Sequence, residues 1–259
     1  RELARRAEAG GADSVWVYDH LLLRLAGQAT GIHEAWTLLT AVAVATTRVE
    51  VGTIVLATSF RNPALLAKMA TTLDEISGGR LVLGLGCGWH EPEYAAFGYP
   101  FDHRVDRFEE SLRIIAPLLR EGAVTFVGAH HRAEGCLILP RGPRDRIPIL
   151  VGAKGPRMLR LAAELADAWN TAWFGMPDDR LLRRIADFRA ACADVGRDPA
   201  SVELTVGVTV KAEADEELDR AGTPAALLAE PHVVADGLRA YAALGVAHVQ
   251  LDVQPATPA

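Results

Sequence analysis

The sequence predicts an α/β fold in which parallel strands are covered by helices. Short, continuously apolar runs recur along the chain, as in strands that are buried on both faces. Amphipathic helical stretches separate these runs almost throughout, which is the pattern of repeated β-α units. A (β/α)8 barrel of about 250 residues and a doubly wound sheet are the two candidate architectures.

The first part of the chain accounts for three strands and three helices. A helix over residues 2–9 ends at Gly10-Gly11, because glycine is common just after a helix C-terminus, and residues 14–18 form a buried strand. A helix over 34–47 and a β-rich strand over 49–56 follow. Pro63 opens a third helix, since proline suits the first helical turn, and Ser77-Gly78-Gly79-Arg80 ends it before the strand over 81–85.

The second part continues the alternation after one interruption. A helix over residues 107–120 comes first, and residues 122–147 then break the pattern and are expected to form an inserted β-hairpin or loop. The remaining strands are expected at 148–151, 167–171, 202–210 and 247–253, and the remaining helices at 156–166, 179–195 and 232–244. No linker-like tract divides the chain, so residues 1–259 are expected to form a single domain.

The two ends of the sequence bear on the barrel prediction. Seven strands are counted, the chain opens on a helix, and residues 254–259 form a proline-containing tail. A barrel therefore fits if its first strand and last helix are missing from the sequence. Because a barrel without one strand exposes two sheet edges, we expect the native protein to be longer at both ends.

Composition excludes several classes of protein. The chain carries 33 acidic and 27 basic groups, a net charge of −6 that argues against a nucleic-acid binder. No apolar run approaches the ~20 residues that a membrane span needs. The three cysteines lie far apart, without a CxxC pair or a disulfide framework. These features predict a cytoplasmic protein with reduced thiols.

Polar residues gather where the predicted strands end, which is where α/β folds place their active sites. Asp19-His20 follows the first strand, and an imidazole gives or takes a proton near neutral pH. A capping aspartate beside a surface histidine accounts for the pair equally well. Asn170-Thr171-Ala172-Trp173 ends a later strand in the same way.

Glycines mark two further strand ends. Gly84, Gly86 and Gly88 leave one strand face without side chains, so that a flat ligand or another backbone can approach closely. Gly152-Ala153-Lys154-Gly155 leads into a helix that begins at Pro156, and its free N–H groups with a lysine suit a phosphate. A plain turn with a solvated Lys154 is the alternative.

No metal site is predicted. His90-Glu91 resembles the start of an HExxH zinc motif, but Tyr94 stands where the second histidine is needed and Pro92 is expected to interrupt the helix. His130-His131 lies in the insertion without partner cysteines and is interpreted as a surface pair.

Three segments together resemble a known family: GADSVWVYDH, VEVGTIVLATSFRNPALLAKMATTLDEISGGRLVLGLGCGWHEPEYAAFG and PILVGAKGPRMLRLAAELADAWN. They resemble the luciferase-like monooxygenases, and within them the branch that uses the deazaflavin coenzyme F420. The resemblance implies a (β/α)8 barrel with the ring of the coenzyme at its C-terminal mouth. It also implies a bulge with a non-prolyl cis peptide bond at Ile54–Val55, backing the ring.

The resemblance also implies roles for individual residues. His20 matches an acid/base histidine at a strand end and Asp19 a carboxylate that contacts the ring, so these two are the predicted catalytic residues. The glutamate acid of the family's sugar-phosphate dehydrogenases is replaced by Trp89, which implies another substrate and a more apolar pocket. The predicted coenzyme-binding residues are Asp19, Ile54, Val55, Leu56, Cys87, Gly88, Gly152, Ala153, Lys154, Gly155 and Asn170.

The function implied is hydride transfer between F420 and a small organic substrate. One alternative is a monooxygenase that uses reduced FMN and oxygen, since FMN shares the tricyclic ring and the ribityl phosphate. A second alternative is a non-catalytic, flavin-binding relative. Residues 21–33 and 122–147 are expected to shape specificity, and a homodimer is expected because the family usually pairs its barrels.

Overall fold

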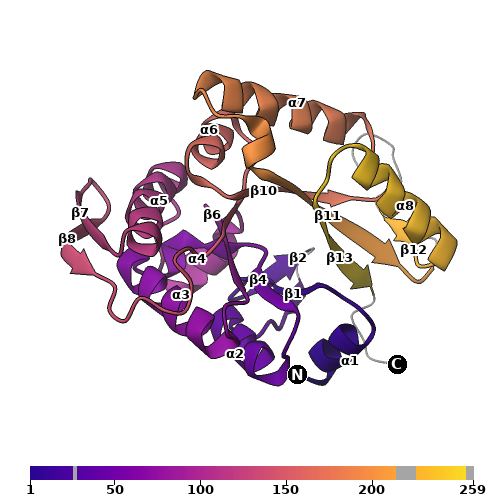
Figure 1. The fold of residues 1–259 in the computed structure, drawn as a ribbon, viewed down its shortest axis with the longest axis horizontal. Helices are drawn as coiled ribbons and strands as arrows, with labels where there is room; N and C mark the ends of the chain where they lie inside the picture. Colours follow the sequence, from indigo (N-terminus) through magenta and orange to yellow (C-terminus); the bar gives the residue numbers. More distant parts are fainter. Residues whose placement is uncertain (26–27, 214–225, 255–259) are drawn as a thin grey trace. The chain divides into compact units, whose positions relative to one another are not determined.

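The computed structural model describes residues 1–25, 28–213 and 226–254, and it confirms the predicted alternation of strands and helices (Figure 1). The chain divides into two compact units, Arg1–Val151 and Gly152–Ala259. A single domain spanning both units stays a prediction. The tail beyond residue 254 lies outside the described residues.

The first unit is built on a parallel sheet. Its strands follow one another in the order β1 (Ser14–Val17), β4 (Glu50–Thr53), β6 (Leu81–Gly86) and β9 (Ile149–Gly152), and β5 (Leu56–Ala57) also pairs with β6. Every residue of β6 is buried, as its continuously apolar sequence predicts. Because these strands are parallel, their C-terminal ends lie at one edge, where the polar residues of the sequence gather.

Helices α1 (Glu2–Ala9), α2 (Ala35–Ala45), α3 (Pro63–Ser77) and α5 (Arg104–Arg120) cover this sheet, and α2, α3 and α5 lie side by side (Figure 1). The start of α3 follows from its sequence. Asn62 caps the helix by accepting the Leu65 N–H at 3.0 Å, Pro63 occupies the first turn, and Gly78 ends the helix with a left-handed φ of 69°.

One helix of this unit was not predicted. Helix α4 (Glu91–Phe97) begins directly after His90, and Pro92 lies in its first turn, where the missing N–H has no helical partner to lose. The expectation that Pro92 interrupts a helix was therefore wrong. Residues 21–33, predicted as a loop, include the short antiparallel ribbon β2 (Leu23–Leu25) and β3 (Gln28–Thr30), while residues 26–27 lie outside the described part.

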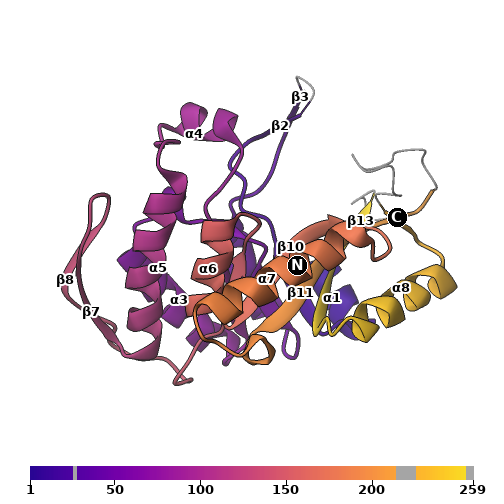
Figure 2. The same cartoon turned by 90° about the horizontal axis from the view of Figure 1, so that it is seen from above.

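The insertion over residues 122–147 is confirmed as a β-hairpin. Strands β7 (Ala123–Val127) and β8 (Arg132–Leu137) pair in antiparallel fashion and form a sheet of their own. The hairpin lies beside α5 in both views (Figures 1 and 2).

The second unit repeats the parallel arrangement. Strand β11 (Glu203–Lys211) pairs with β10 (Ala168–Phe174), β13 (His248–Gln254) and the short β12 (Leu227–Leu228), all parallel. Its helices are α6 (Pro156–Leu165), α7 (Asp179–Asp194) and α8 (Pro231–Ala243), of which α6 packs against α7. Indole stacking of Trp169 on Phe188, with centroids 4.4 Å apart, joins β10 to α7.

Two non-prolyl cis peptide bonds interrupt the strands, and each faces a glycine of the neighbouring strand. The bond at Ile54–Val55 confirms the prediction, whereas the bond at Ala172–Trp173 was not predicted. A Cβ atom on Gly84 would lie 1.8 Å from the carbonyl oxygen of Thr53, just before the first bulge. A Cβ atom on Gly207 would lie 2.6 Å from the Trp173 ring at the second. At Gly84, therefore, the strand face without side chains makes room for the backbone of Thr53.

None of the helices within the described residues has the length and apolar character needed to span a membrane.

Candidate active site

The imidazole of His20 is held by a carboxylate that sequence reasoning missed. His20 follows β1, and its Nδ1 atom lies 2.9 Å from Oε1 of Glu93 on α4. The other oxygen of Glu93 accepts the N–H groups of Leu21 at 2.8 Å and of Leu22 at 3.4 Å. The Glu93 side chain is buried, only 2% exposed, and its two oxygens hold the imidazole of His20 and the backbone of Leu21 and Leu22 in place. Glu93 lies in the first turn of a helix that follows a strand end, and this position could have indicated a site residue. The expectation that Pro92 prevents the helix led us to overlook it.

Two aromatic neighbours flank His20. The Trp89 ring lies edge-on at 5.6 Å between centroids and the His90 ring at 6.2 Å. His90 Nε2 accepts the N–H of Arg24 at 3.0 Å, which assigns the proton of a neutral His90 to Nδ1. Trp89 is 60% exposed and places an apolar ring beside the imidazole. His20 therefore lies between a fixed carboxylate and an exposed indole.

Asp19 is fully engaged by its own neighbours. Its Oδ2 atom accepts the N–H of Ala57 at 2.9 Å and Nη1 of Arg61 at 2.8 Å, while Oδ1 accepts Nη2 of Arg61 at 3.0 Å. The Asp19 side chain is 0% exposed. Since Ala57 belongs to β5, directly after the bulge, Asp19 ties the end of β1 to the bulged segment.

Arg61 extends this pair to a second carboxylate. Its Nη2 atom also donates to Oε1 of Glu34 at 2.6 Å. Burial lowers the pKa of Arg61, but Asp19 and Glu34 outweigh it and raise the pKa above the ordinary value. Partial burial raises the pKa of Glu34, but hydrogen bonds from Thr37, from the Trp36 amide and from Arg61 outweigh it and lower the pKa to about 2. The network is thus one cation held between two carboxylates.

The end of β6 is shaped by a buried tyrosine. Tyr94 donates its hydroxyl to the carbonyl of Cys87 at 3.2 Å, and burial is the main cause that raises its pKa to about 12. Gly88 has a φ of 72°, and a Cβ atom there would lie 1.8 Å from the Tyr94 hydroxyl. The Gly88 carbonyl accepts Nη1 of Arg104 at 2.8 Å. Burial is also the main cause that raises the pKa of the Cys87 thiol. The predicted contact residues Cys87 and Gly88 are therefore held in one backbone conformation.

The residues at the bulge differ in how far they are exposed to solvent. Ile54 and Val55 are half-buried, whereas Leu56, which was also predicted to bind the coenzyme, is 0% exposed and therefore closed to solvent. The hydroxyl Oγ1 of the neighbouring Thr58 is buried and has no hydrogen-bond partner among the described residues.

In the second unit, cations gather near the predicted phosphate loop. Burial and the charges of Arg184 and Arg180 all lower the pKa of Lys154, so the three side chains share one region. Arg184 donates to Oγ1 of Thr171 at 2.7 Å, and the guanidinium of Arg180 lies 4.4 Å from the centre of the Phe174 ring. The N-cap of α6 is Gly155, which offers no side chain to the helix N–H groups. This donor set suits an anion.

Asn170 lies within the sheet of the second unit. Its amide nitrogen donates to Oγ1 of Thr205 at 2.9 Å and to Oε1 of Gln250 at 3.0 Å. The amide nitrogen of Gln250 is buried without a hydrogen-bond partner among the described residues. The structure thus places Asn170 in a buried polar network across β10, β11 and β13.

Parallel β-α units with polar groups after the strands define a protein of the α/β class. The chain belongs to the luciferase-like monooxygenase family, which matches residues 1–254. A solved F420-dependent secondary alcohol dehydrogenase, in complex with an F420–acetone adduct, aligns with 97% of this chain and 88% of its own, at a TM-score of 0.81 and 21% identity. This likeness confirms the predicted barrel-type fold.

Among curated relatives, the chain is 34% identical over 225 residues to an F420-dependent glucose-6-phosphate dehydrogenase of Amycolatopsis mediterranei, an alignment of 83% of this chain and 66% of the relative. It is 32% identical over 202 residues to a 5,10-methylenetetrahydromethanopterin reductase of Methanolobus tindarius, covering 78% of this chain and 57% of the relative. The chain thus spans less than two thirds of the length of these relatives.

Proposed function

We propose that the chain is an oxidoreductase that transfers a hydride between coenzyme F420 and a small organic substrate, with His20 as the acid/base group. The observation that carries the proposal is the His20–Glu93 contact of 2.9 Å at the end of β1. The F420-dependent relative that is 34% identical supports the choice of coenzyme.

The role of His20 follows from its hydrogen bonds. A buried carboxylate that accepts Nδ1–H leaves Nε2 with the lone pair that receives or returns a proton. When bound, F420 supplies or accepts the hydride, and removing a hydride from an alcohol carbon also requires removing the hydroxyl proton. His20 takes that proton in one direction and returns it in the other. Glu93 is a positioning residue that fixes the orientation of the ring.

Asp19 has a different role from the one predicted. Both of its oxygens already accept hydrogen bonds from Arg61 and Ala57, so we assign it to holding the bulged segment rather than to proton transfer. The bulge at Ile54–Val55 would then back the coenzyme ring.

The chemistry of the donor set in the second unit fits the phosphate of such a coenzyme. Lys154 and Arg184 supply charge, and the N-terminus of α6 supplies N–H groups behind Gly155. In the first unit, the buried Thr58 hydroxyl is a polar group that a ligand could satisfy. Asn170 belongs to this proposal only through its backbone and its support of the sheet, because its side-chain amide donates to Thr205 and Gln250.

Trp89 bears on the class of substrate. Its exposed indole lies beside His20 and carries no group that protonates a substrate at neutral pH. An alcohol or ketone with an apolar substituent therefore suits the site better than a sugar phosphate.

The test is a binding titration followed by turnover with the full chain. F420 and FMN are titrated separately, and the absorbance change of F420 is then followed with secondary alcohols, ketones and sugar phosphates. We expect F420 binding and turnover, and for His20→Ala a fall in kcat of at least about 100-fold with F420 affinity kept. His232→Ala, a change at an exposed histidine of α8, is the matched control.

Each other outcome contradicts part of the proposal. Binding of FMN but not F420, with oxygen consumption, would identify the monooxygenase alternative. Tight F420 binding without turnover of any substrate would favour a non-catalytic relative. Unchanged turnover in His20→Ala would remove the acid/base role.

A further inference from the structure

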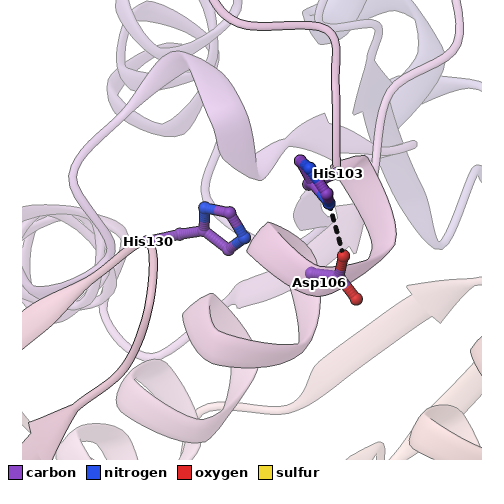
Figure 3. A group of neighbouring side chains, drawn as sticks. All are labelled: His103, Asp106 and His130. Atoms are coloured by element: carbon purple, nitrogen blue, oxygen red, sulfur yellow. Dashed lines mark hydrogen bonds and ion pairs between the residues drawn. The ribbon is translucent and has the colours of Figure 1, made fainter.

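Three potential metal ligands converge where the β7–β8 hairpin meets the start of α5. They are His103, Asp106 and His130, whose ligand atoms all lie within 4.8 Å of one another. Figure 3 shows the three side chains pointing toward one another, His130 from the hairpin side, His103 from the N-cap of α5 and Asp106 from its first turn. The His103 Nδ1 atom lies 3.0 Å from Oδ2 of Asp106, and the two imidazole centroids are 5.3 Å apart.

The backbone presents His103 in an uncommon conformation. His103 is the N-cap of α5 and has a φ of 51°, the only positive φ of a non-glycine residue in the described part of the chain. This conformation precedes the helix that carries Asp106 in its first turn. Two ligands three residues apart are thereby held on one side of the helix start.

The position of the third ligand, His130, is fixed by hydrogen bonds from its turn to Glu110. Glu110, one turn beyond Asp106 on α5, accepts the N–H groups of Ala129 at 2.8 Å, His130 at 2.8 Å and His131 at 2.7 Å. Burial raises the pKa of Glu110, but these three hydrogen bonds outweigh it and lower the pKa. Glu110 thus fixes the backbone of the hairpin turn against α5, and with it the position of His130.

The adjacent histidines, interpreted from the sequence as one surface pair, point to different partners. The Nε2 atom of His131 lies 3.2 Å from Oγ of Ser111, whereas the His130 ring lies near His103. His130 alone is directed toward the other two ligands.

We propose that His103, Asp106 and His130 form a binding site for a divalent transition-metal ion of the Zn²⁺ type. Two imidazoles and one carboxylate are ligands that Zn²⁺ shares with Co²⁺ and Ni²⁺, whereas Mg²⁺ and Ca²⁺ prefer oxygen ligands. Ligand atoms around a tetrahedral zinc ion are about 3.4 Å apart, given bonds of about 2.1 Å. Small side-chain rotations would close the present separations of up to 4.8 Å, and solvent would supply the fourth ligand.

An ion here would join the hairpin to the helix. Two ligands belong to the start of α5 and one to the β7–β8 turn, so bound metal should stabilise the hairpin against local opening. The metal would take the place of the His103–Asp106 hydrogen bond as the contact between those side chains.

The test is calorimetric titration of the coenzyme-free full chain with ZnCl₂ in a phosphate-free buffer, with Co²⁺ absorbance as a second probe. We expect one equivalent of Zn²⁺ to bind, a visible Co²⁺ spectrum, and an affinity at least about 10-fold weaker in His103→Ala and in His130→Ala. His232→Ala, at an exposed histidine of α8, is the control and should bind as the unchanged chain does.

Two results would overturn the site. One is wild-type Zn²⁺ affinity in the His103→Ala/His130→Ala double variant, and the other is an equal loss of binding in His232→Ala, which would indicate only adventitious binding. Circular dichroism establishes that each variant is folded. If an alanine variant does not fold, His130→Gln replaces it, since glutamine keeps a polar side chain while removing the imidazole.

Discussion

The Nδ1 atom of His20 lies 2.9 Å from Oε1 of Glu93, although the two residues are 73 positions apart in the chain, and the second oxygen of Glu93 accepts the Leu21 N–H at 2.8 Å. One buried carboxylate therefore fixes both the histidine ring and the backbone that follows it. In the proposed function this contact would leave Nε2 as the proton-transferring atom, so the proposed acid/base role of His20 depends on Glu93.

Replacing Glu93 by glutamine should reduce turnover more than binding. The amide keeps the size of the side chain but removes the carboxylate that accepts the ring N–H of His20, so kcat should fall about 10- to 100-fold with KM little changed. Steady-state kinetics with F420 measure this split. Glu91→Gln, two positions earlier and exposed, should keep the wild-type kcat. A change in KM alone would contradict the assigned role.

The Asp19–Arg61 pair predicts a loss of stability. Asp19→Asn leaves Arg61 without one of its two carboxylate partners in a site where the Asp19 side chain is 0% exposed. Breaking a buried ion pair costs about 3 kcal/mol, which urea unfolding should detect as a lower midpoint. Asp13→Asn is the matched control, because the Asp13–Arg48 contact is 4.0 Å long and Asp13 is 91% exposed. Equal effects of the two changes would contradict the prediction.

The cation cluster of the second unit predicts the binding of a phosphate group. Lys154→Ala should weaken F420 binding about 10-fold and reduce its salt dependence, because one positive charge is lost near Arg180 and Arg184. Fluorescence titration of F420 at two salt concentrations measures both effects. Arg183→Ala, at an exposed position of α7, should leave them unchanged. An unaltered F420 affinity in Lys154→Ala would exclude this lysine from the phosphate site.

The order of strands and helices could be predicted because it is set locally. The run Leu81–Gly86 is apolar at every position, and glycine and proline mark the ends of the helices around it. The bulge at Ile54–Val55 was also predicted, but only through the resemblance to a family. Its counterpart at Ala172–Trp173 had no such guide, since nothing local in that segment distinguishes it from a regular strand.

The partners of the site residues could not be predicted, because they depend on contacts between distant segments. Asp19 contacts Arg61 and His20 contacts Glu93 across long stretches of sequence. Asn170 was expected at a strand end, but β10 runs from Ala168 to Phe174, so Asn170 lies inside the strand and its side chain bonds within the sheet. The pattern of residues thus located the strand ends but not the direction of each side chain.

The close approach at Gly84 predicts a steric penalty. A Cβ atom there would lie 1.8 Å from the Thr53 carbonyl oxygen, which is backbone and has no room to rotate away. Gly84→Ala should therefore destabilise the fold by about 2–3 kcal/mol and disturb the bulge that follows Thr53. Thermal unfolding compares it with Gly31→Ala, where a Cβ atom would meet nothing within 4 Å. Equal melting temperatures would contradict the contact.

The carboxylate of Glu34 predicts an acid-dependent loss of stability. Its pKa falls from 4.5 to about 2 in the folded protein, so the stability that it contributes is present above pH 4.5 and is lost as the pH falls toward 2. Because the side chain is 43% exposed, solvent screening reduces the contribution to about 1–2 kcal/mol. Glu34→Gln should be less stable than the unchanged chain by this amount at pH 7, and the difference should vanish near pH 2. Urea unfolding across this range, with Glu50→Gln as an exposed control, measures the difference; a gap that persists at pH 2 would show that packing, not charge, causes it.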